Sequence, residues 1–369
     1  MSPDARVAVL GAGTMGSRIA ALFGAAGIRV LLLDLTEQLA AEGHIRAAAG
    51  PLVTPASFDG GLANLSECEW VLEAVAEDLA VKRTLWQRAA PHVSPHAIAS
   101  TNTSGLSLAA ISEALPLVLK QRFLGIHFFN PPAKLRLVEL IRGRDTLPEV
   151  AATAAQFVTE RLGKSVVEAK DTPNFIANRI GAFFSATAQQ LTASGSYTVE
   201  EVDSLTGPLI GLPRSATYRL MDVIGLDIWA QVLRTGEQTD ARFHQQTFFT
   251  QMLHRRMLGD KSGAGFYRKV TTSGQKSFEV IDLHTFEYKP SSSASLTPSA
   301  LPEFPAGLRQ VLSANGRASS FLRPLLTELC KYCHQVAPEI ANSPEDIDRA
   351  MQWGYGWALG PFALEAALS

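Results

Sequence analysis

The first third of the chain alternates short apolar runs with segments of helical composition. RVAVL (6–10) and IRVLLLD (28–34) have the character of buried strands. The Ala/Leu/Ile-rich segment between them suits a helix, which Gly27 can end. Residues 6–34 therefore predict a strand–helix–strand unit.

Further apolar runs extend this pattern toward the middle of the chain. We expect strands within 69–77, 97–104, 122–129 and 135–141, and a short one at 165–171. The first three are separated by helix-like or loop segments, whereas the last two of the four are close enough in sequence to pair antiparallel. The pattern predicts an α/β Rossmann-type doubly wound sheet.

From Thr172 to about Tyr267 the apolar spacing becomes that of long helices. The segment 173–195 is one of them, with Pro173 suited to its first turn. Residues 270–305 are rich in Ser, Pro and Thr, and we interpret them as a linker with one hairpin at 277–288. An all-α domain is expected after the sheet.

A second helical pattern follows the linker and repeats the first. The segment 343–368 resembles 198–227, with Asp348 in the place of Asp203. The later copy stops in mid-pattern at Ser369. We therefore expect a second, partial helical repeat, and a chain that is a fragment of a longer polypeptide.

Composition narrows the class of protein. The 369 residues are 46% hydrophobic, and 33 Lys and Arg face 35 Asp and Glu. The formal net charge of −2 gives no positive excess to attract nucleic acid. No apolar run is long enough for a membrane span, and the N-terminus does not resemble a secretion signal, so a cytoplasmic protein is expected. Of three cysteines, Cys330 and Cys333 form a CxxC that we interpret as two thiols on one helical face, with redox or metal chemistry as the alternative.

The turn after the first strand has the spacing GxGxxG. Gly11 permits a tight turn, Gly13 lets a pyrophosphate approach the backbone, and Gly16 lets helix and strand pack closely. Asp34 ends the next strand, where a carboxylate binds ribose hydroxyls and repels a 2′-phosphate, so NAD is favoured over NADP. The alternative is packing glycines without a nucleotide. The loop also contributes the cofactor-binding candidates Thr14 and Met15.

His127 and Glu139 are the leading catalytic candidates. If Pro131, Pro132 and the residues near Ala133 reverse the chain, the two side chains face one another across neighbouring strands. A carboxylate partner orients an imidazole and stabilises its protonated form, as a general base requires. Near a nicotinamide, such a base suits the oxidation of a secondary alcohol. The alternative is a buried structural histidine.

Further amides and hydroxyls are candidates for holding a ligand. Ser104 and Asn102 follow a buried strand, at the sheet edge where such folds bind ligands, although Ser104 could instead begin a helix as its N-cap. Asn178 lies in an apolar helix, where a hydrogen bond between helices is the alternative role. Asn130 is a further substrate-binding candidate.

Seven motifs together resemble a known family. In chain order they are GAGTMG, LEAVAED, STNTSGL, RFLGIHFFNPP, LVELI, GKSVVEAKDTPNFIANRIG and DKSGAGFY. This set is similar to the 3-hydroxyacyl-CoA dehydrogenases of fatty-acid β-oxidation, over about Arg6 to Tyr267. The later repeat is similar to bacterial forms in which an enoyl-CoA hydratase module is fused to the dehydrogenase.

The resemblance implies an activity and roles for particular residues. The activity is NAD-dependent oxidation of an L-3-hydroxyacyl-CoA thioester to the 3-ketoacyl-CoA, in a cleft between two domains. His127 would be the base and Glu139 its partner, with Ser104 and Asn178 on the substrate oxygens. The resemblance also implies that two further residues contact the nicotinamide half of NAD, and that the helical domain forms a homodimer or covers the cleft. These two residues are Glu77 and Lys82.

The expected domains are an NAD-binding Rossmann domain (1–171), a helical substrate or dimerisation domain (172–269), the linker (270–305) and the partial repeat (306–369). Two departures from the family stand out: a short segment at 40–60, where members carry an arm that holds coenzyme A, and Asn174 in place of a common Gly. Either this protein has lost the arm, or the printed sequence leaves out the residues that form it. A non-catalytic NAD-binding assembly subunit and a reductase of other small β-hydroxy acids are the alternative functions.

Overall fold

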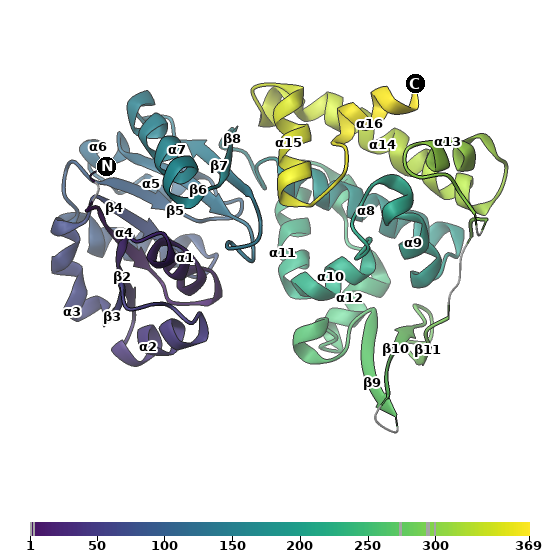
Figure 1. Cartoon of the computed structure of the whole chain (residues 1–369), viewed down its shortest axis with the longest axis horizontal. Helices are drawn as coiled ribbons and strands as arrows, with labels where there is room; N and C mark the ends of the chain where they lie inside the picture. Colours follow the sequence, from purple (N-terminus) through teal and green to yellow (C-terminus); the bar gives the residue numbers. More distant parts are fainter. Residues whose placement is uncertain (1, 3, 273–274, 293–295, 299) are drawn as a thin grey trace. The chain divides into compact units, whose positions relative to one another are not determined.

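The computed structural model describes residues 2, 4–272, 275–292, 296–298 and 300–369. The chain divides into two compact units (Figure 1). One comprises residues 1–176 and 339–342, and the other comprises 177–338 and 343–369. The boundaries between the four segments expected from the sequence stay a prediction.

The first unit is built on an eight-stranded sheet with the order β3-β2-β1-β4-β5-β6-β7-β8. Neighbouring strands are parallel except β6 and β7, which are antiparallel. The expected doubly wound sheet and its antiparallel pair are confirmed. The strands are β1 (Arg6–Leu10), β2 (Arg29–Asp34), β3 (Val53–Ser57), β4 (Trp70–Glu73), β5 (Ile98–Thr101), β6 (Phe123–Phe128), β7 (Leu137–Arg142) and β8 (Ser165–Ala169).

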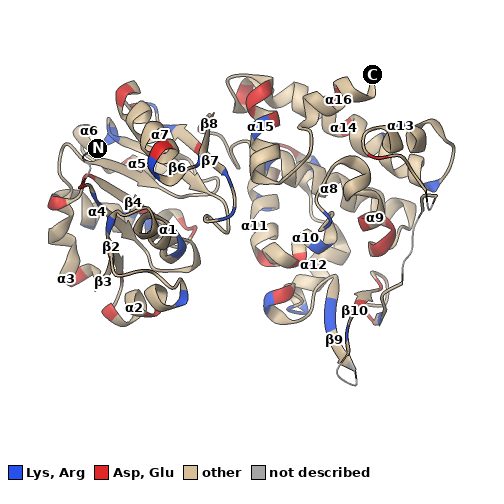
Figure 2. Cartoon of the chain, in the orientation of Figure 1, with Lys and Arg blue, Asp and Glu red and all other residues tan. Residues whose placement is uncertain are grey.

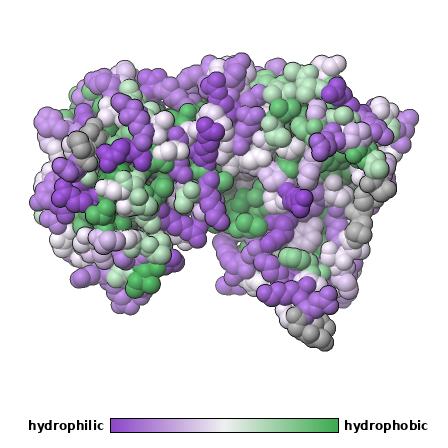
Figure 3. Space-filling model, viewed as in Figure 1, coloured by the Kyte–Doolittle hydropathy of each residue, from purple (hydrophilic) through white to green (hydrophobic). Residues whose placement is uncertain are grey.

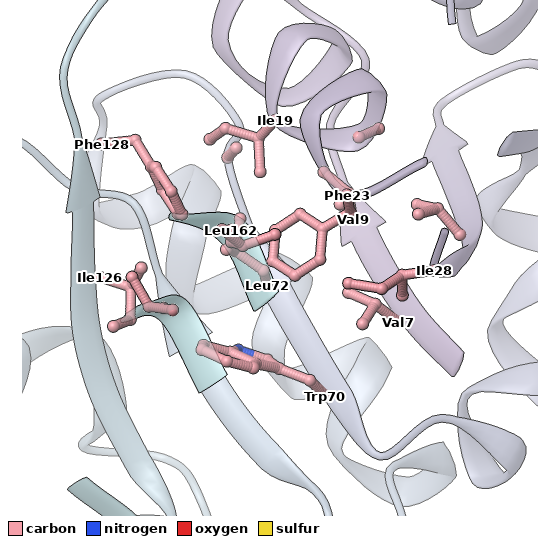
Figure 4. Packing of buried hydrophobic residues seen from close by; sticks show 14 of the residues in the cluster. Val7, Val9, Ile19, Phe23, Ile28, Trp70, Leu72, Ile126, Phe128 and Leu162 are labelled. Carbon is pink, nitrogen blue, oxygen red and sulfur yellow. The ribbon is translucent and has the colours of Figure 1, made fainter. Parts of the chain in front are cut away.

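Helices α1 and α7 supply apolar side chains to a common core with β1, β4 and β6. Phe23 of α1 meets Trp70 of β4 edge-on, with ring centroids 6.1 Å apart (Figure 4). The core fixes α1 against the strand that precedes it. The helices of this unit are α1 (Thr14–Ala25), α2 (Glu37–Arg46), α3 (Phe58–Gly61), η1 (Leu62–Glu67), α4 (Leu79–Ala89), η2 (Ala90–His92), α5 (Leu108–Ser112), α6 (Leu117–Lys120) and α7 (Pro148–Leu162).

Strand β3 was not expected from the sequence. Its five residues, VTPAS, contain a proline and only one large apolar side chain, so they do not give a strand pattern. β3 lies at the edge of the sheet and pairs only with β2. An edge strand tolerates Pro55 because its second side has no neighbour that needs a backbone N–H group.

The second unit is helical apart from a small antiparallel sheet. The hairpin expected at 277–288 is confirmed, because Ile281 pairs with Tyr288, and β9 adds a third strand that was not expected. The strands are β9 (Tyr267–Thr272), β10 (Gln275–Ile281) and β11 (Tyr288–Pro290). The helices are α8 (Ala177–Gly195), α9 (Val199–Leu205), η3 (Pro208–Ile210), α10 (Tyr218–Ile224), α11 (Leu226–Glu237), η4 (Ala241–Phe243), α12 (Thr247–His254), η5 (Asp260–Ser262), α13 (Ala306–Ser313), α14 (Arg317–Ile340), α15 (Pro344–Gly354) and α16 (Pro361–Leu368).

The first long helix of this unit begins later than its sequence suggests. Pro173 was expected in the first turn, but α8 starts at Ala177. Asn174 and Phe175 have φ angles of 64° and 51°, in the left-handed region that a right-handed helix cannot contain. Residues 172–176 therefore form a turn before the helix, and the expected helix start at Pro173 is wrong.

The internal repeat is confirmed by equivalent capping groups. Thr198 caps α9 and Ser343 caps α15, each accepting a hydrogen bond from the backbone three residues on. Asp203 accepts bonds from the backbone N–H groups at the start of α10, and Asp348 does so at the start of α16. The same two positions therefore organise both copies.

Among the described residues, both signs of charge are spread over the elements of each unit (Figure 2). The visible face is largely hydrophilic, with small apolar areas between polar side chains (Figure 3). Among the described residues, none of the helices combines the length and apolar character needed to cross a bilayer.

Candidate active site

The glycine loop between β1 and α1 has the shape that binds a dinucleotide. Gly11 has a φ of 104°, and a Cβ there would lie 2.7 Å from the Ala74 carbonyl oxygen. A Cβ on Gly16 would lie 1.8 Å from the Gly11 carbonyl oxygen, so this position also requires glycine. At the exposed Gly13 a Cβ would meet no atom within 4 Å. That space and the uncapped N-terminus of α1 suit a pyrophosphate.

Asp34 closes the other side of this loop. Its Oδ2 accepts a hydrogen bond of 2.6 Å from the Ala12 N–H, and its Oδ1 accepts one from the Leu35 N–H at 2.7 Å. Arg46, at the end of α2, donates to the Ala12 carbonyl at 2.6 Å. The carboxylate is held at the end of β2, where it can accept from ribose hydroxyls. In the first turn of α1, Thr14 is exposed and Met15 is half-buried.

His127 and Glu139 are brought together as expected. They are opposite residues in the β6–β7 ladder, and His127 Nδ1 lies 2.8 Å from Glu139 Oε2. Both are buried, and Glu139 Oε1 accepts a further bond from the Ile176 N–H at 3.1 Å. An ionised Glu139 only accepts hydrogen bonds, so Nδ1 is the donor and Nε2 is left to exchange a proton.

Aromatic rings and a reversal at the prolines frame this pair. The rings of Phe129 and Phe175 have centroids 4.3 Å and 5.9 Å from the imidazole. Lys134 and Leu135 donate backbone bonds to the Pro131 carbonyl, which turns the chain between β6 and β7. The expected reversal is confirmed.

Asn130 lies in an exposed position directly after β6. Its Oδ1 accepts a hydrogen bond from Arg18 Nη1 of α1. This bond ties the loop after β6 to the helix that follows the glycine loop. Asn130 is therefore near the dinucleotide-binding turn rather than isolated from it.

A buried ionic network links the ends of β4 and β5. Lys82 is 1% exposed, with its Nζ 2.7 Å from Glu73 Oε1 and 3.3 Å from Glu77 Oε2. Glu73 is fully buried and also accepts from Thr101 Oγ1 at 2.6 Å. The ammonium of Lys82 thus faces two carboxylates of its own unit. Only the outer one, Glu77, is partly exposed.

Glu77 holds the loop that carries Ser104. Its Oε1 accepts from Thr103 Oγ1 at 2.6 Å and from the Ser104 N–H at 2.7 Å. Nearby, Asn102 Oδ1 accepts from the Phe128 N–H at 2.9 Å, which joins this loop to β6. The candidates at the carboxyl ends of β4, β5 and β6 therefore share one edge of the sheet.

Ser104 is not the N-cap of the next helix. That role belongs to Ser107, and Asp171 accepts further bonds from the first N–H groups of α5. Within the described part of the chain, the Ser104 hydroxyl has no hydrogen-bond partner. This leaves it available for a ligand oxygen.

The sequence did not place Glu73 in the site, and for Asn174 it left two roles open, narrowing the acyl site or capping the helix start. The signal for Glu73 was its position in an apolar strand, since a buried carboxylate needs a partner. Asn174 is 2% exposed and packs against Gly105, where a Cβ would lie 2.7 Å from the Asn174 nitrogen. It supports the Ser104 loop and does not begin a helix.

Asn178 lies in the first turn of α8, in the second unit. Its Oδ1 accepts a hydrogen bond of 3.0 Å from the Tyr355 hydroxyl, at the C-terminus of α15. The helix–helix bond considered for Asn178 therefore exists. Its partner was not identified from the sequence, because 177 positions separate the two residues.

The family is decided by two matches that together cover most of the chain. The NAD binding domain of 3-hydroxyacyl-CoA dehydrogenase matches residues 6–172, and the C-terminal domain of the same enzyme matches residues 175–269. The chain belongs to the 3-hydroxyacyl-CoA dehydrogenase family. Its first unit thus contains the NAD-binding domain of that family.

Relatives of this dehydrogenase family member differ in length. A probable 3-hydroxyacyl-CoA dehydrogenase of Bacillus subtilis is 36% identical over 405 residues, covering 98% of this chain and 51% of the relative. A putative trifunctional enzyme of the fatty acid oxidation complex from Rickettsia prowazekii is 30% identical, covering 97% of this chain and 52% of the relative. The chain thus spans about half the length of these relatives. The first alignment is longer than the 369 residues of this chain, so the Bacillus protein carries residues that this chain lacks.

Solved structures show the same architecture. (S)-3-hydroxybutyryl-CoA dehydrogenase from Ralstonia eutropha is 26% identical, with a TM-score of 0.62 over 70% of this chain and 97% of that chain. The 3-hydroxybutyryl-CoA dehydrogenase of Escherichia coli, 22% identical, has a TM-score of 0.77 and covers 100% of this chain and 92% of its own. The second likeness shows that the fold extends through the later repeat.

Proposed function

We propose that this dehydrogenase family member oxidises L-3-hydroxyacyl-CoA thioesters to 3-ketoacyl-CoA with NAD, in fatty-acid β-oxidation. The observation that carries the proposal is the buried His127–Glu139 pair, at 2.8 Å, in the unit that holds the glycine loop. A base oriented by a carboxylate is the group that alcohol oxidation needs. Family membership supplies the substrate class.

His127 Nε2 takes the proton of the 3-hydroxyl group. Glu139 holds the imidazole through Nδ1 and stabilises the positive charge that it gains. The Ser104 hydroxyl and the Asn178 amide hold the substrate oxygen, with Asn130 as a further substrate contact. When bound, NAD supplies the nicotinamide that accepts the hydride from the same carbon.

The cofactor is held by groups of the first unit. The loop glycines 11, 13 and 16 admit the pyrophosphate, with Thr14 and Met15 beside it, and Asp34 binds the adenosine ribose. Glu77 and Asn102 are proposed on the nicotinamide side. Lys82 is proposed to act there through Glu77, because its ammonium is buried against that carboxylate.

The wider context is also proposed. The Rickettsia relatives are named trifunctional enzymes, which supports a fused enoyl-CoA hydratase module beyond residue 369. Homodimer formation and a cytoplasmic location are further proposals, supported by the family resemblance. The short segment before β3 is proposed to lack the arm that contacts coenzyme A in relatives, which would weaken binding of that part of the substrate.

An assay of acetoacetyl-CoA reduction tests the proposal. The consumption of NADH is measured by its absorbance. His127→Ala is expected to lower kcat by about 10²–10⁴-fold, the usual cost of losing a general base, while NADH affinity stays the same. His244→Ala is a matched control, because His244 forms an exposed pair with Glu237, also at 2.8 Å. It should leave kcat unchanged.

Two results would contradict this function. Tight NADH binding without turnover of any CoA thioester would favour a non-catalytic assembly subunit. Turnover that survives in His127→Ala would remove the base from the mechanism.

A further inference from the structure

Tyr355 connects the later repeat to a proposed substrate group. Its hydroxyl donates to Asn178 Oδ1 at 3.0 Å, and Asn178 is 9% exposed. An amide whose oxygen accepts from a phenol still has its NH₂ group, on the other branch of the same planar carbon, available to donate elsewhere. That NH₂ group has no hydrogen-bond partner in the part of the chain that the structure describes.

Gly181 leaves room for the Tyr355 ring to pack against α8. A Cβ at this position would lie 2.7 Å from Tyr355 Cζ and 2.9 Å from the Tyr355 hydroxyl oxygen. Glycine is less favourable than alanine inside a helix, so its use in α8 calls for a packing reason. The close approach of the ring, three residues after Asn178, provides that reason.

The tyrosine is itself held in place from two sides. The Tyr355 N–H bonds to the Met351 carbonyl at 3.0 Å, and the chain then turns at Gly356, whose φ is 71°. The Trp229 ring of α11 meets the Tyr355 ring edge-on, with centroids 6.5 Å apart. The hydroxyl is thus presented by an ordered helix end rather than by a mobile side chain.

The residue at position 355 also distinguishes the two copies of the repeat. Tyr355 stands directly before Gly356, and in the earlier copy Ile210 stands directly before Gly211, which has a similar φ of 76°. Isoleucine has no hydroxyl to donate. The later copy therefore supplies a polar group that the earlier one lacks.

We propose that Tyr355 is a positioning residue, which fixes the Asn178 amide so that its NH₂ group is donated to the carbonyl oxygen of the thioester substrate. This inference rests on the proposed function, because it assumes that Asn178 binds the substrate. Tyr355 acts only through Asn178 and touches no reacting atom. The later repeat thereby contributes to substrate binding.

A double-mutant cycle on Tyr355→Phe and Asn178→Ala tests the proposal. Tyr355→Phe keeps the ring and removes the hydroxyl, so KM for acetoacetyl-CoA should rise about 3- to 10-fold, the effect of one neutral hydrogen bond, while KM for NADH is unchanged. In the Asn178→Ala background, Tyr355→Phe should add nothing. Gly181→Ala, which displaces the ring, should reproduce the Tyr355→Phe result.

The matched control is Tyr218→Phe. The Tyr218 hydroxyl is buried and bonds to Thr192 Oγ1 at 2.7 Å, so the change removes a similar hydrogen bond elsewhere on α8. It should lower the melting temperature without changing KM for acetoacetyl-CoA. A rise in KM in this control would show that general loosening of the unit explains the effect.

Binding is measured separately by calorimetry with acetoacetyl-CoA in the presence of NAD. A Kd that rises with KM in Tyr355→Phe supports the positioning role. The inference is overturned if the variant matches the wild type, or if its effect is equally large without Asn178. A wild-type protein that neither binds nor reduces acetoacetyl-CoA overturns the proposed function, and the inference with it.

Discussion

Lys82 and Glu73 form an ion pair at 2.7 Å in which neither side chain is more than 1% exposed. The pair anchors the start of α4 to the end of β4, beside the carboxylate that holds the Ser104 loop. Charges so deeply buried are tolerated only when they are paired and hydrogen-bonded. Removing the Lys82 ammonium leaves the buried Glu73 carboxylate without its ion-pair partner.

We expect Lys82→Met to lower the free energy of unfolding by about 3–5 kcal/mol. Urea denaturation measures this change. Arg88→Met is the control, because Arg88 pairs with Asp59 at the same distance of 2.7 Å but at the surface, and should cost less than about 1 kcal/mol. Equal losses for the two variants would mean that the burial of Lys82 is unimportant.

Glu139→Gln is expected to keep the position of His127 but to remove the charge that stabilises its protonated form. A hydrogen bond to a charged group contributes about 1.5–3 kcal/mol, so kcat should fall roughly 10- to 100-fold. The pH–rate profile should change as well, because the carboxylate no longer stabilises the protonated imidazole. An unaltered profile would exclude Glu139 from the mechanism.

Asp34→Ala is expected to act on the cofactor and not on the chemistry. The change removes the acceptor for the ribose and one of the bonds to the glycine loop. KM for NADH should rise about tenfold or more, while kcat at saturating NADH stays within about twofold. The kcat/KM with NADPH should rise relative to that with NADH, and steady-state kinetics with both cofactors would measure this change. A fall in kcat alone would contradict this assignment.

The two copies of the repeat predict matched losses of stability. Thr198→Ala and Ser343→Ala each remove an N-cap and should lower the free energy of unfolding by about 1 kcal/mol. Ser194→Ala, on an exposed part of α8, should have almost no effect. If only one cap proves important, the copies are not equivalent in stability.

The three thiols are expected to react slowly in the folded protein. Burial raises the pKa of Cys68 and of Cys330 to about 11, and it raises the pKa of Cys333 well above its usual value. At pH 8 only about one thiol in a thousand is then the reactive thiolate. A disulfide reagent should modify all three only after unfolding in guanidinium. Rapid modification of the folded chain would revive the redox interpretation of the CxxC.

Local patterns predicted much of the fold and the centre of the site. The glycine loop, the strands of alternating βα units and the His127–Glu139 register all depend on residues within a few dozen positions. Strand β3 was not predicted, because its pairing with β2, and not its composition, makes it a strand. The start of α8 was predicted too early, because the left-handed turn at Asn174 is set by packing against Gly105.

By itself, the sequence determined the doubly wound sheet, the dinucleotide-binding turn and the base with its carboxylate, since each follows from short-range spacing and strand geometry. Only the tertiary structure decided that Lys82 is buried between Glu73 and Glu77, and that Asn178 meets Tyr355. Such contacts join residues whose separation along the chain carries no periodic signal. The packing of whole elements brings them together.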